Sequence, residues 1–190
     1  MRQTRPPRRS SKKTAELTKA RPGAEVFFFD GGRFGLKPSF GKMWAKKGEH
    51  PVVAVRPGYK NFFAYSAVSP DTGEDVTLFL GVVNTETMSY FLAHMAERFG
   101  GRKCLLVMDR AGWHCSKELA VPPGMEIIYL PPRSPELNSV ERLWQWLKMH
   151  TIRNRLYLAL EEVMDSVQEC LNSATPDFLK SLCRCSYLLH

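Results

Sequence analysis

The chain has 190 residues, with ordinary apolar (44%) and charged (24%) fractions and a formal net charge of +8. These values exclude a wholly disordered chain and fit one domain that buries its own core. No apolar run approaches the roughly 20 residues of a membrane helix, and no apolar stretch follows the basic N-terminus as in a secretory signal. The five cysteines include no CxxC pair, so we expect free thiols in a cytoplasmic protein.

The positive charge is concentrated in two segments. Residues 1–22 carry +7 and residues 33–60 carry +6, whereas the rest of the chain is slightly acidic. We expect 1–22 to be a flexible basic arm that precedes a single domain over 23–190. Such an arm is either a solvated tail or a surface for a polyanion. As candidate contacts to a DNA backbone we select Arg5, Arg8, Arg9, Lys12, Lys13, Lys46, Lys47, Arg56 and Lys60.

The spacing of apolar residues predicts a domain of alternating strands and helices. The run Val26–Phe29 is typical of a strand buried on both faces, and this strand is expected to end at Asp30. In the basic segment that follows, Trp44 and Val52–Val55 are expected to pack inward. Strands are predicted over 62–68, 76–80, 105–108 and 126–130, and helices over 85–99, 137–149 and 160–171. This order predicts a mixed α/β sheet flanked by helices.

Two predicted strands end in an aspartate. Asp30 and Asp109 each follow four apolar residues, and ligands gather at the carboxyl ends of parallel strands. If the two strands are parallel neighbours, both carboxylates enter one space, where Mg²⁺ or Mn²⁺ would relieve their repulsion. Glu141 lies at the rim of the apolar face of its helix and is placed to join them. The alternative is that the aspartates cap turns and that Glu141 is solvated.

The residues around Asp109 and Glu141 resemble a known family. The segments 107–114 (VMDRAGWH) and 130–144 (LPPRSPELNSVERLW) are similar to the DDE transposases of the mariner-like superfamily. The bacterial insertion sequence 630 type is the branch they resemble most, and only its catalytic domain is matched. The resemblance covers about 24–175, and the chain departs from the family pattern at Gly31, Arg110, Arg133 and Ser139.

This resemblance implies an RNase H-like fold and a catalytic triad of Asp30, Asp109 and Glu141 that binds two Mg²⁺ or Mn²⁺ ions. It implies metal-dependent phosphoryl transfer, in which water cuts a strand at a transposon end and the freed 3′-hydroxyl attacks target DNA. It also implies a homodimer and a nucleoid-associated location. His114 matches the family's histidine and either orients a phosphate or a metal-bound water, or hydrogen-bonds within the scaffold. Further candidates for binding phosphate or supporting the triad are Arg110, Arg133 and Arg142.

Full transposases of this kind carry N-terminal helix-turn-helix domains, for which residues 1–22 are too few. We therefore expect either a split element, completed by an upstream helix-turn-helix polypeptide, or a truncated relic. A second possible function is a non-catalytic DNA-binding or dimerising remnant that modulates a full-length transposase. A third is a resolvase-like nuclease on the same fold. Cys183 and Cys185 have no partner ligands at metal-site spacing, and we expect them to be structural.

Overall fold

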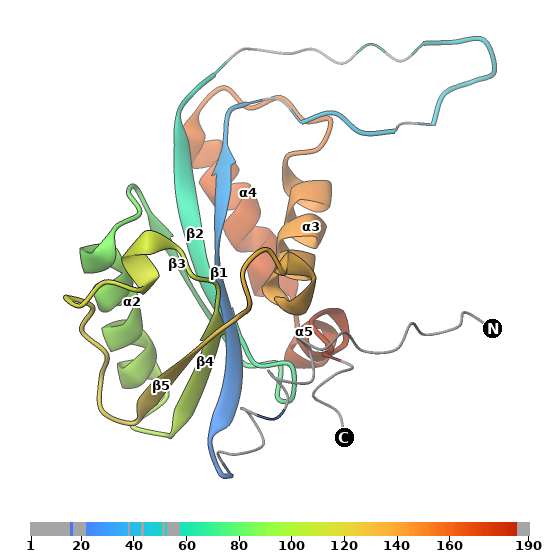
Figure 1. The fold of residues 1–190 in the computed structure, drawn as a ribbon. Coiled ribbons are helices and arrows are strands. Elements are labelled where there is room, and N and C mark those ends of the chain that lie inside the picture. Colours follow the sequence, from blue (N-terminus) through green and yellow to red (C-terminus); the bar gives the residue numbers. More distant parts are fainter. Residues whose placement is uncertain are drawn as a thin grey trace.

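The apolar run that begins after Glu25 forms the central strand of a five-stranded mixed sheet, with helices on both faces (Figure 1). The computed structural model describes residue 16 and residues 22–37, 39–42, 44–50, 52 and 58–185. The strands lie in the order β3-β2-β1-β4-β5. Strand β1 is antiparallel to β2 and parallel to β4, β2 is antiparallel to β3, and β4 is parallel to β5. The predicted mixed α/β sheet is confirmed.

The predicted strands and helices are present, with small shifts of their ends. The strands are β1 (Glu25–Gly35), β2 (Asn61–Val68), β3 (Asp75–Leu80), β4 (Cys104–Met108) and β5 (Met125–Tyr129). The helices are α2 (Thr85–Arg98), α3 (Val140–Thr151), α4 (Leu160–Ser173) and α5 (Pro176–Leu182), and two short 3₁₀ turns are η1 (Gly112–His114) and η2 (Pro135–Leu137). Helix α5 was not predicted, because its seven residues are too few for a clear apolar period.

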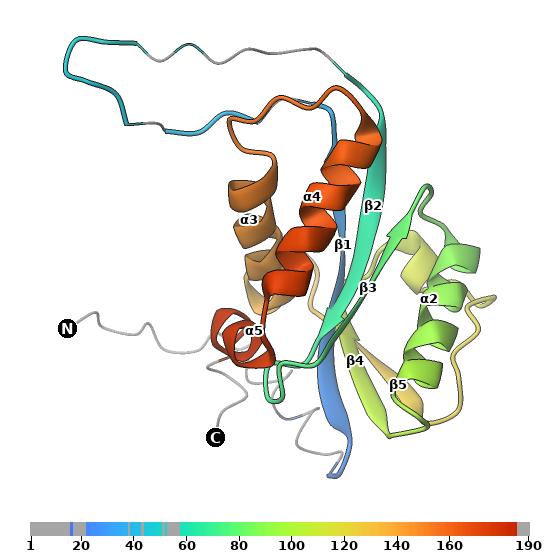
Figure 2. The ribbon, with the colours of Figure 1, turned by 180° about the vertical axis from the view of Figure 1, so that it is seen from behind.

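Side chains of β1 alternate between the two faces of the sheet. Phe27 and Phe29 pack in the cluster that includes α2, whereas Phe28 packs in the cluster that includes α3 and α4. All three are fully buried, as the sequence predicted for a strand covered on both sides. Figures 1 and 2 show α2 on one face and α3 and α4 on the other. Each buried phenylalanine contributes about 1.5–3 kcal/mol through its apolar area.

The prediction that the first strand ends at Asp30 is wrong. Strand β1 continues to Gly35, and its second half pairs with β2, with Asp30 opposite Ser66 and Gly32 opposite Ala64. Glycine is a poor strand former, and the sequence therefore indicated a stop. The pairing with β4, however, covers only Glu25–Phe28. Asp30 therefore still lies just beyond the carboxyl end of the parallel part of the sheet.

The helix that carries Glu141 begins at Val140, not at the predicted Leu137. The three residues before Asn138 form the 3₁₀ turn η2, which begins with Pro135. By contrast, α2 begins as predicted after Asn84, whose side chain accepts a hydrogen bond from the Thr87 N–H in a capping box. Proline is tolerated in the first turn of a helix but donates no backbone hydrogen bond. Here Pro135 begins the 3₁₀ turn η2, which is separate from α3.

The described part of the β1–β2 connection extends away from the sheet (Figure 1). Trp44 is 102% exposed and Val52 is 94% exposed. The prediction that they pack inward is therefore wrong, and Val53–Val55 lie outside the described residues. The described residues of this connection form no strand or helix beyond an isolated bridge between Ser39 and Arg153, so they have no regular face to bury.

Two further predictions concern the cysteine thiols and the absence of a membrane-spanning helix. None of the five cysteines forms a disulfide, and Cys183 and Cys185 are buried, in agreement with their predicted structural role. None of the described helices combines the length and apolar character needed to cross a bilayer.

Candidate active site

Asp30 faces helix α3 because of the two-residue period of β1. Phe28, Asp30, Gly32 and Phe34 share one face of the strand, and the Phe34 ring meets the Trp144 ring edge-on at 5.8 Å. The Trp144 indole lies so close to the backbone that a Cβ atom on Gly32 would come within 2.7 Å of its ring. Gly32 helped to make the strand hard to predict. Because it has no side chain, it also lets α3 approach the sheet closely.

The Asp30 carboxylate is half-buried, and its pKa differs from the ordinary value. Its Oδ2 accepts a hydrogen bond of 3.0 Å from Trp144 Nε1. Burial, followed by the negative charge of Glu141, raises the pKa of Asp30 to about 6, although the Gly31 N–H and the Trp144 N–H oppose the rise. The charge of Asp109 raises it further. The charges of Glu141 and Asp109 therefore both act on Asp30, as predicted for carboxylates in a shared space.

Asp109 directly follows β4 and is held by its own loop. Its Oδ1 accepts hydrogen bonds from His114 Nδ1 at 2.8 Å and from the Ala111 N–H at 3.2 Å. The hydrogen bond from His114 is the main reason that the pKa of Asp109 lies below its ordinary value. An ionised carboxylate only accepts hydrogen bonds, so Nδ1 carries the proton. Of the two expected roles for His114, the structure supports hydrogen bonding within the scaffold.

His114 is itself fixed on two sides. The residue is 3% exposed, and its ring meets the Phe29 ring edge-on at 5.4 Å. The Tyr129 hydroxyl at the end of β5 donates a hydrogen bond of 2.6 Å to the His114 carbonyl. A strand residue on each side thus holds the histidine that orients Asp109.

Asn138 places Glu141 beside Asp30. Its Nδ2 donates a hydrogen bond of 2.8 Å to the carbonyl of Phe29, the residue before Asp30, and its Oδ1 accepts one of 3.3 Å from the Val140 N–H. The start of α3 is thereby anchored to β1. Glu141 and Trp144 are three residues apart on α3 and share the face that looks toward this strand.

The three carboxylates line one cavity of about 300 Å³, just beyond the parallel pairing of β1 with β4. Among the described residues, no Lys or Arg nitrogen lies within 4.0 Å of any of the three carboxylates. Two exposed arginines share the lining. The Arg110 guanidinium lies 5.6 Å from the centre of the Tyr129 ring, and Arg133 adopts a positive φ of 57° in the loop before η2. The rest of the wall comes from Ala111, Leu130, Pro131, Pro132, Ser134, Pro135 and Asn138.

The arrangement is not a preformed metal centre. Within the described ranges, no three His, Cys, Asp or Glu side chains are grouped so that they could hold a metal ion. Mutual repulsion is a sufficient physical reason for like charges to stay apart when no cation is between them.

Several of the selected basic residues lie elsewhere. Arg142 does not line the cavity, and its charge acts instead on the buried Cys183 thiol. Lys46, Lys47 and Lys60 are exposed in the β1–β2 connection. The other selected residues fall outside the described part of the chain: Arg5, Arg8, Arg9, Lys12, Lys13 and Arg56.

Sequence reasoning missed the hydrogen bond from Trp144 to Asp30 and the close packing at Gly32. The available signal was the spacing of Glu141 and Trp144 on one helical face, together with a glycine two residues after Asp30 on one strand face. Neither pattern states which helix meets which strand, because the two segments are more than 100 residues apart.

Comparison with known proteins identifies the family. A family model described as DDE superfamily endonuclease matches residues 25–164, from the start of β1 into α4. The chain belongs to this family. The match covers every carboxylate of the cavity and both 3₁₀ turns.

Two relatives of the DDE domain match by sequence. The uncharacterised protein y4pE/y4sA of Sinorhizobium fredii is 35% identical over 103 residues, which cover 54% of this chain and 76% of that protein. The insertion element IS630 uncharacterised 39 kDa protein of Shigella sonnei is 26% identical over 159 residues, which cover 80% of this chain and 46% of that protein. The chain is thus a homologue of an IS630-type insertion element protein, and it spans about half of that protein's length.

The solved structures establish the fold. The Mos1 strand transfer complex superposes with a TM-score of 0.67 at 15% identity, covering 92% of this chain and 56% of the Mos1 chain. The Mos1 mariner paired end complex with Mn has a TM-score of 0.68 at 15% identity, with 92% and 57% coverage. The DDE domain is therefore RNase H-like, as the resemblance implied.

Proposed function

We propose that this chain is the catalytic domain of a DNA transposase that cleaves DNA strands and transfers them by metal-dependent phosphoryl transfer. The catalytic residues would be Asp30, Asp109 and Glu141. The observation that carries the proposal is the convergence of these three carboxylates on one cavity, where no described Lys or Arg nitrogen lies within 4.0 Å of them. Membership of the DDE superfamily endonucleases supports the same reaction class.

The donor set fits Mg²⁺ or Mn²⁺. The three side chains offer only carboxylate oxygens, which hard divalent cations prefer, and no thiol or lysine competes within the cavity lining. A carboxylate with a pKa raised to about 6 is one whose negative charge lacks compensation, and a cation would supply it. Mos1 complexes with Mn and with Mg support this choice of ion. When bound, two ions stabilise the attacking and leaving oxygens of an in-line displacement.

Neighbouring residues orient the carboxylates and influence their ionisation. His114 keeps Asp109 ionised and oriented through the hydrogen bond to Oδ1. Trp144 orients Asp30 through Oδ2 and leaves the other carboxylate oxygen free of that bond. Burial raises the pKa of Asp30 to about 6 in the metal-free protein, so a bound cation would stabilise its ionised form.

Arg110 and Arg133 are placed to bind the DNA backbone at the cavity. Both are exposed and line the cavity beside the carboxylates, and a planar guanidinium matches a phosphate with two parallel hydrogen bonds. Lys46, Lys47 and Lys60 in the exposed connection would add sequence-independent phosphate contacts, as would the basic arm 1–22.

The partners of the complete system follow from the same proposal. The DNA would be the element's ends and the target, and a homodimer would bring two ends together. Since the chain spans about half of the Shigella relative, an upstream helix-turn-helix polypeptide is the proposed source of end recognition. We place the protein in the cytoplasm, associated with the nucleoid.

The test is strand cleavage and strand transfer on DNA that carries the element's ends, with Mg²⁺ or Mn²⁺ and with EDTA. Asp109→Asn and Glu141→Gln should each abolish both products. The matched controls are Asp165→Asn and Glu161→Gln, which change exposed carboxylates of α4 in the same way. Activity that persists in the Asp109 or Glu141 variants would refute the proposed triad.

One observation favours a different function, a non-catalytic DNA-binding or dimerising remnant that modulates a full-length transposase. The carboxylates are not grouped as a ready metal site within the described residues. Isothermal titration with Mg²⁺ and Mn²⁺ separates the two proposals. Metal binding that is lost in Asp109→Asn supports the catalytic domain, whereas salt-dependent DNA binding without metal binding or cleavage supports the remnant.

A further inference from the structure

Strand β3 has a free edge that no described strand covers. It is the first strand in the sheet order, and only β2 pairs with it. The Ser69 N–H donates a hydrogen bond of 2.8 Å to the Glu74 carbonyl, which starts the β2–β3 ladder. Because ladder bonds alternate along an antiparallel pair, Val76, Leu78 and Leu80 bond to β2. The N–H and C=O groups of Asp75, Thr77 and Phe79 therefore point to the open edge.

A second contact supports this register. The Thr77 hydroxyl donates a hydrogen bond of 2.9 Å to the Ser66 hydroxyl across the pair. Side chains approach most closely at the pairs whose backbone groups do not bond to each other. The backbone groups of Thr77 are therefore not used by β2.

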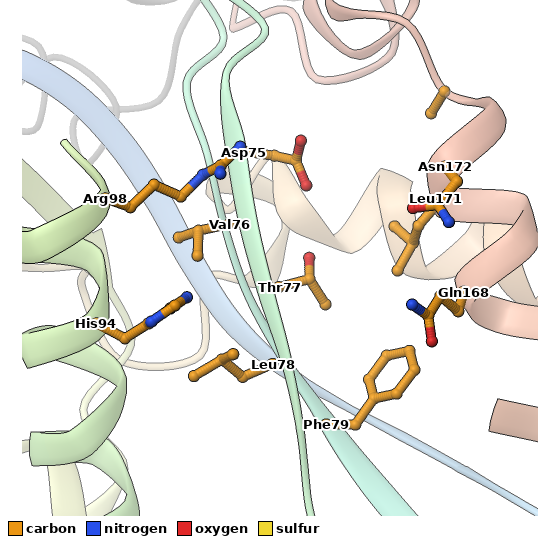
Figure 3. Close-up of a pocket in the computed structure, with 11 residues that line it drawn as sticks. Asp75, Val76, Thr77, Leu78, Phe79, His94, Arg98, Gln168, Leu171 and Asn172 are labelled. Atoms are coloured by element: carbon orange, nitrogen blue, oxygen red, sulfur yellow. The ribbon is translucent and has the colours of Figure 1, made fainter. Parts of the chain in front are cut away.

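A groove of about 430 Å³ runs along this free edge between two helices (Figure 3). His94 and Arg98 of α2 form one wall together with Val76 and Leu78, as Figure 3 shows. The opposite wall is formed by the side chains of Asp75, Thr77 and Phe79 with Gln168, Leu171 and Asn172 of α4. The groove is therefore bounded by an open strand edge and by one wall on each sheet face.

We propose that this groove binds an extended peptide as a sixth strand beside β3, with acidic side chains toward α2 and apolar side chains toward α4. The groups at the edge supply the ladder, as in other cases of strand addition. The proposal concerns the opposite edge of the sheet from β5 and does not depend on the carboxylate cavity.

Charge complementarity selects the chemistry of the peptide. Side chains of an added strand alternate between the faces. On the α2 face they meet His94 and Arg98. The Arg98 charge also attracts the Asp75 carboxylate, but no described carboxylate lies within 4.0 Å of Arg98. On the α4 face they meet Phe79 and Leu171, and the Asp75 carboxylate there repels acidic groups. A peptide that alternates glutamate and valine meets both demands.

The test is fluorescence anisotropy of a labelled glutamate–valine peptide as long as β3, titrated with the whole protein. We expect saturable binding that weakens at least about tenfold in Arg98→Glu, since the attraction becomes repulsion. Thr77→Pro should weaken it similarly, because proline removes an edge N–H without disturbing the ladder to β2. Thr77→Val loses the hydroxyl but keeps the N–H, and Lys103→Glu reverses an exposed charge outside the groove. Both controls should bind as the wild type does.

A modified peptide keeps the test independent of any variant's folding. N-methylation of alternate peptide residues blocks the ladder but leaves the side chains, and it should abolish binding to the wild type. A lysine–valine peptide should bind at least about tenfold more weakly than the glutamate–valine peptide. Equal binding of the methylated peptide would overturn the proposal, as would unchanged binding in Arg98→Glu. A peptide-free dimer that Thr77→Pro dissociates would assign the edge to a second copy instead and would also overturn it.

Discussion

Replacing Asp30 by asparagine removes one negative charge from a cavity that contains two others. In the folded protein, burial and the Glu141 charge raise the pKa of Asp30 from 3.8 to about 6. One pH unit corresponds to about 1.4 kcal/mol, so ionised Asp30 costs the folded state about 3 kcal/mol at neutral pH. Asparagine is close in shape, and its carbonyl oxygen still accepts the hydrogen bond from Trp144. In EDTA at pH 8, Asp30→Asn should therefore unfold with a free energy higher by about 1–3 kcal/mol.

The raised pKa of Asp30 also predicts how the stability difference between wild type and Asp30→Asn depends on pH. A carboxyl with a raised pKa in the folded state favours the protonated folded form, so its stabilising effect is complete below about pH 4. That effect is lost as the pH rises through about 6. The difference between wild type and Asp30→Asn should accordingly be small at pH 4 and largest above pH 7. The lowered pKa of Asp109 acts in a separate window, because its contribution is lost only as the pH falls below its ordinary range.

Urea unfolding in EDTA at several pH values measures this stability difference. The matched control is Asp165→Asn, which changes an exposed carboxylate of α4. Adding Mg²⁺ should reverse the order of stability, because the ion binds only the folded wild type with its full set of carboxylates. An Asp30→Asn variant that is no more stable than wild type in EDTA at pH 8 would refute the electrostatic reasoning. Stabilisation by Mg²⁺ that is equal in both proteins would refute the metal-binding role of Asp30.

Three further variants test the contacts that position the carboxylates. Gly32→Ala places a Cβ atom 2.7 Å from the buried Trp144 ring and should lower the free energy of unfolding in urea by about 1–3 kcal/mol. Trp144→Phe removes the N–H donor to the β1 aspartate, so the pH at which half of the Mg²⁺ binding is lost in calorimetry should move upward. His114→Ala removes the main donor to Asp109, so cleavage should fall at least about tenfold and Mg²⁺ affinity should fall with it.

Each variant has a control of the same type. Gly81→Ala meets no atom within 4 Å and should leave stability unchanged. Trp146→Phe alters a half-buried tryptophan that packs on Phe178, and His150→Ala alters an exposed histidine bonded to its own helix. Neither should change Mg²⁺ binding. The positioning argument fails if Gly81→Ala costs as much as Gly32→Ala, or if His150→Ala impairs cleavage as much as His114→Ala.

Local patterns predicted most of the fold because they report local physics. The run of three phenylalanines indicated a strand buried on both faces, and Phe27, Phe28 and Phe29 are all buried. Apolar residues at helical spacing located α2, α3 and α4 within a few residues. The errors arose where tertiary contact overrode local preference. Gly31 and Gly32 continue β1 because β2 pairs with them, and Trp44 is exposed although tryptophan usually packs in a core.

The sequence by itself determined the local positions of the three carboxylates: Asp30 and Asp109 each follow an apolar run, and Glu141 lies at the rim of an apolar helix face. The tertiary structure brings the three carboxylates to one cavity, because the contacts between β1 and α3 join segments that are distant in the sequence. Only the tertiary structure decided the charge state and orientation of these groups, because Trp144 and His114 act through packing and hydrogen bonds between distant elements. The free edge of β3 is likewise a property of the assembled sheet, since a strand becomes an edge only by having no neighbour.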